Sequence, residues 1–417
     1  MRRIYFDHAA STPVDSRVLR AMRPYFSREF GNPGSLHSFG QHAIGAVDAA
    51  REEIGKLIGA KHFREIIFTG GATEANNLAL RGAVEFYKKN NVAGAIYANA
   101  AARPRIIISS IEHESIFETA RALERDGVEV ITLPVNKEGV IDIVALKEAL
   151  NEHTVVVSVM HVNNEVGTIE PLREIKFMID EFRKSVAGAG VSAGADGAVY
   201  PLLHTDAAQS FPYLYCDVAM LGVDMVTLST HKMNGPKGVG ALYVRRDEKA
   251  FPEGGGFPLA AQVSGGGQEF GVRSGTENVP GIVGFARAAQ LAAAARGKNA
   301  ARVAALRDEL WKRIKAAVPN AEMNGPAGDA KAQHILNIYF PGHVAQDLLT
   351  QFDRMGLAAS SGSACRSRAV ESSYVIEALG YGKARARASI RFSMGKDTTK
   401  GEVVAAAKII KKVLFAE

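Results

Sequence analysis

The sequence predicts an α/β protein with a mostly parallel sheet, and three observations support this fold class. Short apolar runs rich in β-branched residues recur along the chain, and helical patterns such as 42–59 and 114–127 lie between them. The runs are continuously apolar, which is typical of parallel strands covered by helices on both faces. Strand and helix also alternate, as they do in α/β architectures. The predicted strands are 65–69, 105–110, 129–134, 154–161, 202–206 and 224–229.

A second domain is expected because 417 residues are too many for one small core. In the last third of the chain the pattern changes to a long alanine-rich helix over 281–318, followed by a shorter mixed α+β region. We therefore predict a large domain over 14–295. The N-terminal residues 1–13 and the C-terminal part 296–417 are predicted to form a small α+β domain.

Two Gly/Ala-rich stretches, 90–104 and 185–201, look like surface insertions. Both have little hydrophobic pattern, so we expect a loop or a frayed helix in each. We assign no function to either stretch.

Composition and charge narrow the class of protein. Hydrophobic residues make up 47% and charged residues 23%, which are ordinary values for a globular protein. The net charge of +6 comes without a Lys/Arg block, so we expect no direct nucleic-acid partner; acidic partners and anionic cofactors stay open. No apolar run approaches the roughly 20 residues of a membrane helix, and the first residues lack a signal-peptide pattern. We expect neither a membrane partner nor a metal site.

The chain has only two cysteines, Cys216 and Cys365. Because two cysteines cannot form a disulfide framework, we expect a reducing, cytoplasmic setting and free thiols. Cys216 lies among apolar residues in "YLYCDVAM" and is predicted to be a small core residue. Cys365 lies among small and basic residues in "SSGSACRSR". It is either a reactive thiol on a mobile loop or an incidental cysteine in a flexible connection.

The strongest local signal is a lysine that follows a predicted strand. In "VTLSTHKMNGPKG" the strand ends at Ser229, and His231 and Lys232 come before a Gly/Pro-rich loop. Ligands bind at the carboxyl ends of strands in α/β domains, and a desolvated lysine there has a lowered pKa and forms Schiff bases. The alternative is a solvent-facing lysine in a turn.

An aspartate occupies the same kind of position earlier in the chain. Asp206 ends the strand in "LLHTDAAQS". A buried carboxylate needs a positive partner, and the protonated pyridine nitrogen of pyridoxal phosphate (PLP) is such a partner. Gln209 could then reach the ring hydroxyl. The alternative for Asp206 is a helix N-cap.

A strand, a Gly-Gly turn and a helix follow one another in "FTGGATEANNLAL". Backbone amides of Gly71, Ala72 and Thr73 at the start of a helix would cradle an anion such as a phosphate. The segment lacks the Gly-Lys-Ser/Thr of a nucleotide P-loop, so it does not imply ATP. A capped helix start without a ligand is the alternative.

Three further side chains are candidates. His113 in "SSIEHESIF" could stack on a flat cofactor and pass protons, or simply form hydrogen bonds in a loop, and the same alternatives apply to Asn164. Arg391 interrupts an apolar strand-like run in "ASIRFSMG". An arginine there needs a carboxylate, which is either an internal Asp or Glu or that of an amino-acid substrate.

Together these motifs resemble the cysteine desulfurases, a group within the class V aminotransferases that have the PLP-dependent transferase fold of type I. The similarity covers nearly the whole chain in the right order. The family fold implies a large domain with a mostly parallel, seven-stranded sheet and a smaller α+β domain that carries a cysteine loop at about 360–372. The matching motifs are "YFDHAASTPVD", "FGNPGSLHSFG", "FTGGATEANNLAL", "EHESI", "HVNNEVGTI", "HTDAAQS", "LSTHKMNGPKGVGALYVRR", "GGGQEFGVRSGTEN", "SSGSAC" and "SIRFSMG".

The resemblance implies a role for each matching position. Lys232 would hold PLP as a Schiff base, Asp206 would pair with the ring nitrogen and Gln209 with the ring oxygen, and His113 would stack on the ring and transfer protons. Arg391 and Asn164 would bind the α-carboxylate of the substrate. The residues at the phosphate would be Thr73, Ser229, His231 and, from the neighbouring subunit of a homodimer, Thr276, beside the amides of Gly71 and Ala72 described above.

The implied reaction converts L-cysteine to L-alanine. The thiolate of Cys365 attacks the sulfur of the substrate and becomes a persulfide, since only a thiolate makes this attack. The "SSGSAC" form resembles the subgroup that serves iron–sulfur cluster assembly and tRNA thiolation, so protein sulfur acceptors are the implied partners. Arg366 and Arg368 are more basic than the family's usual residues there, and they leave the identity of the acceptor open. Selenocysteine lyase, another class V activity and a non-catalytic sulfur-transfer platform are the alternatives.

Overall fold

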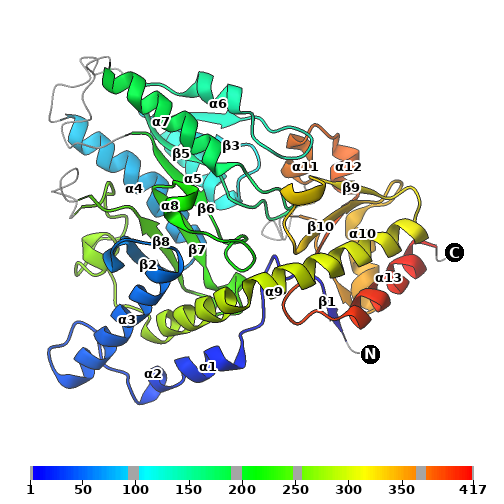
Figure 1. Cartoon of the computed structure of the whole chain (residues 1–417), viewed down its shortest axis with the longest axis horizontal. Coiled ribbons are helices and arrows are strands. Elements are labelled where there is room, and N and C mark those ends of the chain that lie inside the picture. Colours follow the sequence, from blue (N-terminus) through cyan, green and yellow to red (C-terminus); the bar gives the residue numbers. More distant parts are fainter. Residues whose placement is uncertain (1–2, 93–102, 189–199, 248–255, 363–371, 416–417) are drawn as a thin grey trace.

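A twisted seven-stranded sheet forms the centre of the larger part of the molecule (Figure 1). The computed structural model describes residues 3–92, 103–188, 200–247, 256–362 and 372–415. The strand order is β2-β8-β7-β6-β5-β3-β4. The predicted fold class is therefore confirmed. The strands are β2 (Ile66–Thr69), β3 (Arg105–Ser109), β4 (Glu129–Leu133), β5 (Thr154–Ser158), β6 (Leu202–Asp206), β7 (Met225–Ser229) and β8 (Gly240–Val244).

Five of these strands, from β7 to β4, run parallel to their neighbours, whereas β8 is antiparallel to both β7 and β2. All six predicted strands are present. The sequence analysis did not include β8, because this strand directly follows the glycine-rich loop after Lys232 and shares its glycine content. The parallel arrangement brings the carboxyl ends of β3, β5, β6 and β7 to one edge of the sheet.

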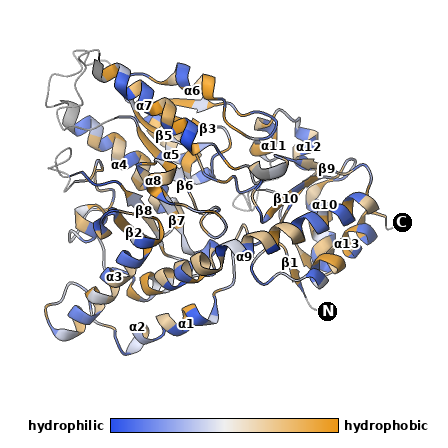
Figure 2. Ribbon diagram, viewed as in Figure 1, coloured by the Kyte–Doolittle hydropathy of each residue, from blue (hydrophilic) through white to orange (hydrophobic). Residues whose placement is uncertain are grey.

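Helices cover both faces of this sheet, as the continuously apolar strands predict. On β3, Ile106 and Ile108 pack against α4 (Ala72–Val92) and α5 (Glu114–Arg125), while Ile107 faces the opposite core. Figure 2 shows the hydrophobic residues concentrated along the strands and the helix sides that face them. The opposite core also contains side chains from α1 (Ser16–Met22), α3 (Ser38–Leu57), α6 (Ile143–Ala149), α7 (Leu172–Gly188) and α8 (Val218–Leu221).

A second core lies at the other end of the molecule, beneath a three-stranded antiparallel sheet of order β12-β10-β9. The N-terminal β1 (Ile4–Tyr5) pairs in parallel with β11 (Leu357–Ala358), so both ends of the chain contribute to this region. Its remaining elements are β9 (Glu322–Asn324), β10 (Ile335–Tyr339), β12 (Ser389–Ser393), α10 (Ala345–Arg354), α11 (Tyr374–Ala378), α12 (Lys383–Arg387) and α13 (Lys400–Leu414).

The long helix α9 (Val279–Ala317) runs from one core to the other (Figure 1). Ile282 and Phe285 near its start belong to the core of the large sheet, and Leu310 and Ile314 near its end belong to the second core. The predicted helix is thus present, and the proposed boundary at residue 295 falls inside it. The division into two domains stays a prediction.

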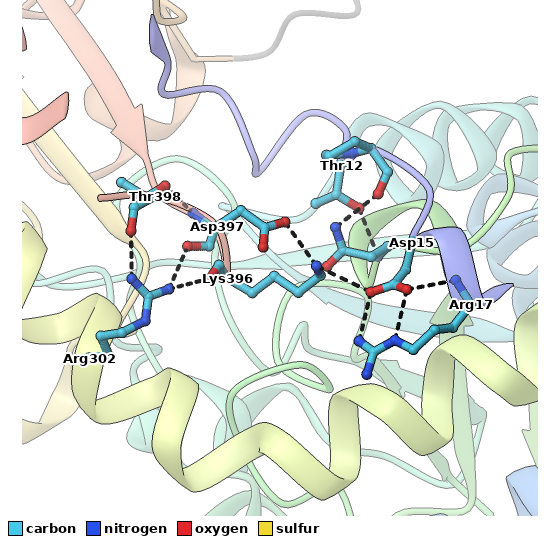
Figure 3. Close-up of polar contacts among 10 residues, drawn as sticks. Thr12, Asp15, Arg17, Arg302, Lys396, Asp397 and Thr398 are labelled. Carbon is cyan, nitrogen blue, oxygen red and sulfur yellow. Dashed lines mark hydrogen bonds and ion pairs between the residues drawn. The ribbon is translucent and has the colours of Figure 1, made fainter. Parts of the chain in front are cut away.

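Polar contacts join α9 to the two ends of the chain (Figure 3). The Arg302 guanidinium donates to the backbone carbonyls of Lys396 and Thr398. The Lys396 ammonium in turn lies 3.2 Å from the Asp15 carboxylate, which also caps α1 and pairs with Arg17. The segment that follows β1 is therefore fixed between the two cores.

Most of each predicted insertion lies outside the described residues, so their predicted conformations stay predictions. Of their described parts, 90–92 and 185–188 continue α4 and α7, whereas 103–104 and 200–201 lead into β3 and β6. None of the helices described here is both long enough and apolar enough to cross a lipid bilayer.

Candidate active site

A cavity of about 1130 Å³ opens at the edge of the large sheet where the parallel strands end. Nine of the predicted site residues line it: Gly71, Ala72, Thr73, His113, Asn164, Asp206, Gln209, His231 and Lys232. Ser229, Thr276 and Arg391 are outside its described lining. Cys365 lies outside the described residues.

Lys232 reaches the cavity from a 3-10 turn, Thr230–Lys232, that follows β7 directly. Its Nζ donates to the backbone carbonyls of Ala9 and Ala10. These two carbonyls belong to the N-terminal segment, which the sequence analysis quoted only as part of a motif. The signal that could have identified them is the pair of small residues, which allows the backbone to approach a lysine closely.

His231 is held beside Lys232 by a hydrogen bond between its Nδ1 and the Ser229 hydroxyl, 2.9 Å apart. Burial lowers the pKa of His231 to about 4, and the nearby Lys232 charge adds to this effect. The imidazole is therefore neutral at pH 7. Ser229 itself is fully buried, and it acts on the cavity through His231 rather than by lining it.

Asp206 ends β6 with its carboxylate at the cavity and only 5% of the residue exposed. Oδ1 accepts from the Ala208 amide at 2.9 Å, and Oδ2 accepts from Asn76 Nδ2 at 2.8 Å. Both donors are neutral. A cationic ligand nitrogen in the cavity would supply the positive partner that a buried carboxylate requires.

The sequence analysis missed Asn76, which connects two predicted residues. Its Nδ2 donates both to Asp206 and to the Ser115 hydroxyl, and this hydroxyl is 2.9 Å from His113 Nδ1. Asn76 is buried on α4, one helical turn after Ala72. This spacing was the available signal, because it places Asn76 on the same helix face as the residue that opens the helix.

His113 precedes α5 as its N-cap residue, and its Nδ1 accepts from the Ser115 amide at 3.1 Å. Burial lowers the pKa of His113, although the Asp206 carboxylate opposes this shift. The neutral ring therefore carries its proton on Nε2, since Nδ1 is an acceptor. A neutral imidazole can both stack on a flat ligand and accept or donate a proton.

The predicted anion cradle is present at the start of α4. The helix begins at Ala72, directly after Gly71. The φ of Gly71 is 149°, a backbone conformation that residues with a side chain rarely adopt. A side chain at Gly71 would extend into open space at the cavity. The first amides of a helix have no intrahelical acceptor, so those of Ala72 and Thr73 are suited to hold a phosphate.

The rim of the cavity carries charges that the sequence analysis did not identify. Arg273 pairs with Glu74 at 2.6 Å, and Glu74 also accepts from the Gly70 amide. Lys237 and Arg81 line the same cavity. This excess of cationic side chains favours an anionic ligand.

Arg391 lies on β12 and is 2% exposed. Its Nη2 pairs with Asp7 at 2.8 Å, and its Nη1 donates to the backbone carbonyl of Asn164 at 2.9 Å. The internal partner is therefore present. The Asn164 side-chain oxygen is buried and has no hydrogen-bond partner within the described part of the chain. The substrate-binding roles of Arg391 and Asn164 stay predictions.

The described residues on either side of Cys365 are fixed close to these groups. Ser360 forms an antiparallel bridge with Arg391 through two backbone hydrogen bonds. On the other side, the Ser373 hydroxyl donates to Glu165 Oε2, and Gly362 packs against the same oxygen. Both flanks thus meet the loop that carries Asn164.

Cys216 is 1% exposed in a core of the large sheet, as predicted. Burial raises the pKa of its thiol to about 11, so the thiolate is scarce at pH 7. Cys216 is thus a structural residue.

The residues of the cavity fit PLP. A lysine amine, a buried carboxylate, a neutral imidazole and a helix N-terminus converge on one space. These four groups suit, in turn, the aldehyde, the ring nitrogen, the ring face and the phosphate of the cofactor.

Comparison with known proteins agrees with a PLP-binding site in this cavity. The aminotransferase class-V family model matches residues 4–405. A cysteine desulfurase IscS from Anaeromyxobacter sp. (strain Fw109-5) is 43% identical over 96% of this chain and 89% of its own length. The mitosomal cysteine desulfurase of Trachipleistophora hominis is 41% identical over 97% of this chain and 85% of its own length.

Solved structures similar to this chain point to the same family. A NifS-like protein superposes with a TM-score of 0.84 at 32% identity and 99% coverage of both chains. The structure of SspA in complex with cysteine superposes with a TM-score of 0.76 at 32% identity, over 95% of this chain and all of that chain. This chain therefore belongs to the cysteine desulfurases of the aminotransferase class-V family.

Proposed function

We propose that this protein is a PLP-dependent cysteine desulfurase that converts L-cysteine to L-alanine and transfers the sulfur to Cys365. The observation that carries the proposal is the convergence of Lys232, Asp206 and His113 on one cavity. When bound there, PLP supplies an electron sink for the charge left by removal of the substrate's α-proton.

The chain's own residues prepare the site for this chemistry. Lys232 Nζ provides the amine that holds the cofactor and later moves a proton. The Asp206 carboxylate, fixed by Asn76, keeps the ring nitrogen protonated. His113, neutral and with its proton on Nε2, is suited to exchange a proton with the reacting substrate. Gln209, which lines the same cavity, would hold the ring oxygen.

The sulfur-transfer step uses Cys365 as nucleophile. Its thiolate attacks the substrate sulfur, so that a new S–S bond forms while the substrate's C–S bond breaks. The electron pair of that bond goes to the substrate's β-carbon, which takes up a proton and becomes the methyl group of alanine. Asn164 and Arg391 would orient the substrate's carboxylate. This role is supported by the place of Asn164 in the cavity lining and by the hydrogen bond from Arg391 Nη1 to the Asn164 backbone carbonyl.

A homodimer is part of this proposal. The segment from α2 (Pro24–Ser27) to the start of α3 exposes several large apolar side chains, among them Phe26, Phe30 and Leu36, the last of which is 92% exposed. A second copy would cover them. Thr276 is exposed and lies outside the described lining, three residues after Arg273, which lines the cavity; this position suits a phosphate ligand to a neighbouring subunit.

We further propose that the sulfur acceptors are proteins of iron–sulfur cluster assembly or tRNA thiolation, and that the protein works in the cytoplasm. The "SSGSAC" form of the cysteine segment supports these acceptors, and the scarcity of cysteine supports the setting. Trapping labelled sulfur on proteins that bind persulfide-loaded Cys365 would identify the acceptor.

The experiment that tests the function measures alanine and sulfide from L-cysteine, with PLP and a reductant present. Lys232→Ala and Cys365→Ser are expected to lose sulfide release, and mass spectrometry should find one added sulfur atom on Cys365 in the unaltered protein. Cys216→Ala is the matched control and should keep its activity. A Cys365→Ser protein that releases sulfide at the unaltered rate would contradict the proposal.

A further inference from the structure

A buried histidine just before β10 contacts Gln209, a residue that lines the cofactor cavity. His334, immediately before β10, is 3% exposed and stacks on the Tyr213 ring, with centroids 4.3 Å apart and planes 18° from parallel. Its Nε2 lies 3.1 Å from Oε1 of Gln209. Gln209 lines the cavity and His334 does not, so any effect of His334 on a ligand passes through Gln209.

The partners of Gln209 fix the orientation of its side-chain amide. One end of the amide faces the backbone carbonyl of Ala9 at 2.9 Å. A carbonyl oxygen only accepts, so this end must be the nitrogen Nε2. The oxygen Oε1 therefore faces His334, and the hydrogen between them belongs to Nε2 of His334.

The protonation state of His334 agrees with this assignment. The pKa of His334 is lowered to about 3. Burial is the main cause, and the nearby positive charge of Arg391 contributes. The ring is therefore neutral and carries a single proton. Its Nδ1 has no hydrogen-bond partner among the described residues, as expected for the bare nitrogen of the Nε2–H form.

With Oε1 held by His334, the amide nitrogen of Gln209 is left with two hydrogens. The Ala9 carbonyl accepts one of them. The other is available to an acceptor on the cavity side, where Gln209 forms part of the lining. Without the His334 donor, only the hydrogen bond to the Ala9 carbonyl would hold the amide. A rotation that gives up this one bond would present the Gln209 oxygen to the cavity, where it would repel an anionic ligand oxygen.

We propose that His334 is a positioning residue that keeps Gln209 oriented as a hydrogen-bond donor toward the ring oxygen of PLP. This inference rests on the proposed function for the identity of the ligand, but the His334–Gln209 contact itself does not. It links a side chain outside the cavity lining to the electronic state of the cofactor, because donation to the ring oxygen stabilises its negative charge.

The predicted consequence concerns the Schiff base that Lys232 forms with PLP. Negative charge on the ring oxygen is largest when the neighbouring imine nitrogen has lost its proton. A donor at this oxygen therefore favours the deprotonated imine, and removal of the donor raises the pKa of the imine. We expect a rise of about one unit, the size of one hydrogen bond to a charged oxygen.

The experiment titrates the visible absorbance band of the PLP-loaded protein against pH. His334→Phe keeps a flat ring against Tyr213 but removes the donor, and its imine pKa should rise by about one unit. His334→Gln places an amide nitrogen near the former Nε2 and should restore most of the original pKa. Tyr213→Phe is the matched control, since it keeps the stacked ring and loses only the hydroxyl, and its imine pKa should not change.

Three results would overturn the proposal: no shift in His334→Phe, an equal shift in His334→Gln, or an equal shift in Tyr213→Phe. A second measurement on the unaltered, cofactor-free protein covers the case in which a variant does not fold. Nitrogen-15 NMR of the histidine side chains should show His334 in the Nε2–H form without titration between pH 5.5 and 9. A Nδ1–H form or a titrating ring would contradict the assignment.

The two measurements also separate this proposal from the proposed function. If the unaltered protein formed no visible band with PLP, the proposed function would fail, and the NMR result would still decide whether His334 donates to Gln209. A normal band with an unshifted His334→Phe titration would leave the function intact and reject the role of His334.

Discussion

One buried carboxylate, Asp206, organises the polar residues around it. Its charge needs both a cationic partner in the cavity and neutral donors behind it, and Asn76 is the side chain that supplies the latter. The same amide reaches Ser115 and, through it, His113. At the scale of single residues, the site therefore depends on an asparagine that touches no reacting atom.

The first prediction is that Asn76→Ala weakens PLP binding and lowers kcat by about tenfold, because a hydrogen bond to a buried charged group is worth about 1.5–3 kcal/mol. The absorbance of bound PLP and the rate of alanine formation measure these effects. Asn136→Ala, in an exposed turn, is the control and should leave both quantities unchanged. Equal behaviour of the two variants would contradict the role of Asn76.

A second buried carboxylate, Glu112, gives a pH prediction. It is fully buried, and burial raises its pKa to about 8. Its Oε1 accepts from the Ser109 hydroxyl and the Met160 amide, whereas Oε2 has no partner within the described residues. In the folded protein Glu112 is therefore protonated at pH 7, while in the unfolded chain it is ionised.

This difference makes the folded state bind more protons than the unfolded state between the usual pKa of a glutamate and about 8. The free energy of unfolding should thus fall as pH rises through this window, by a few kcal/mol. Urea unfolding at pH 5, 7 and 9 measures the slope. Glu112→Gln keeps the accepting oxygen and cannot ionise, so its slope should be smaller; an unchanged slope would assign the pH dependence to other groups.

At the scale of elements, most of the architecture could be predicted, because buried parallel strands and amphipathic helices carry strong periodic patterns. β8 escaped prediction since its glycines continue those of the preceding loop. The site was predictable where side chains follow strand ends, as Asp206 and Lys232 do. It was not predictable where a distant segment supplies a backbone group, as Ala9 does for Lys232, or where long-range packing decides a partner, as for His334.

The elements that flank Cys365 support a prediction about sulfur transfer. The Ser373 hydroxyl donates to Glu165 and also caps α11 by accepting from the Ile376 amide. Ser373→Ala should slow persulfide formation on Cys365 about tenfold, since loss of a cap and one hydrogen bond costs about 1–2 kcal/mol. PLP binding should not change, because no PLP-binding residue is altered.

Ser372→Ala is the matched control for this prediction, as the Ser372 hydroxyl contacts Glu377 instead of Glu165. Single-turnover labelling of Cys365 with cysteine measures both variants. If Ser372→Ala slowed persulfide formation as much as Ser373→Ala, the contact with Glu165 would not be the cause.

At the scale of the whole molecule, Arg302 is predicted to contribute to global stability. It donates to the carbonyls of Gly395, Lys396 and Thr398 and so holds the turn that contacts Asp15 (Figure 3). Arg302→Ala should lower the free energy of unfolding by about 2–3 kcal/mol, because buried acceptors lose a charged donor.

Arg313→Ala, on the same helix, removes only a partly exposed i,i+4 pair with Glu309 and should cost less than about 1 kcal/mol. Urea denaturation of both variants measures the difference. Similar losses would show that any arginine of α9 has this effect, and would contradict a specific role for the contacts of Arg302.

The continuity of α9 has a mechanical consequence. A helix of 39 residues is about 60 Å long at 1.5 Å per residue, and its two halves are embedded in different cores. Domain-closing enzymes place their hinges in loops or at element ends. Here that connection is a stiff rod, so the second core cannot swing over the cavity without bending a helix.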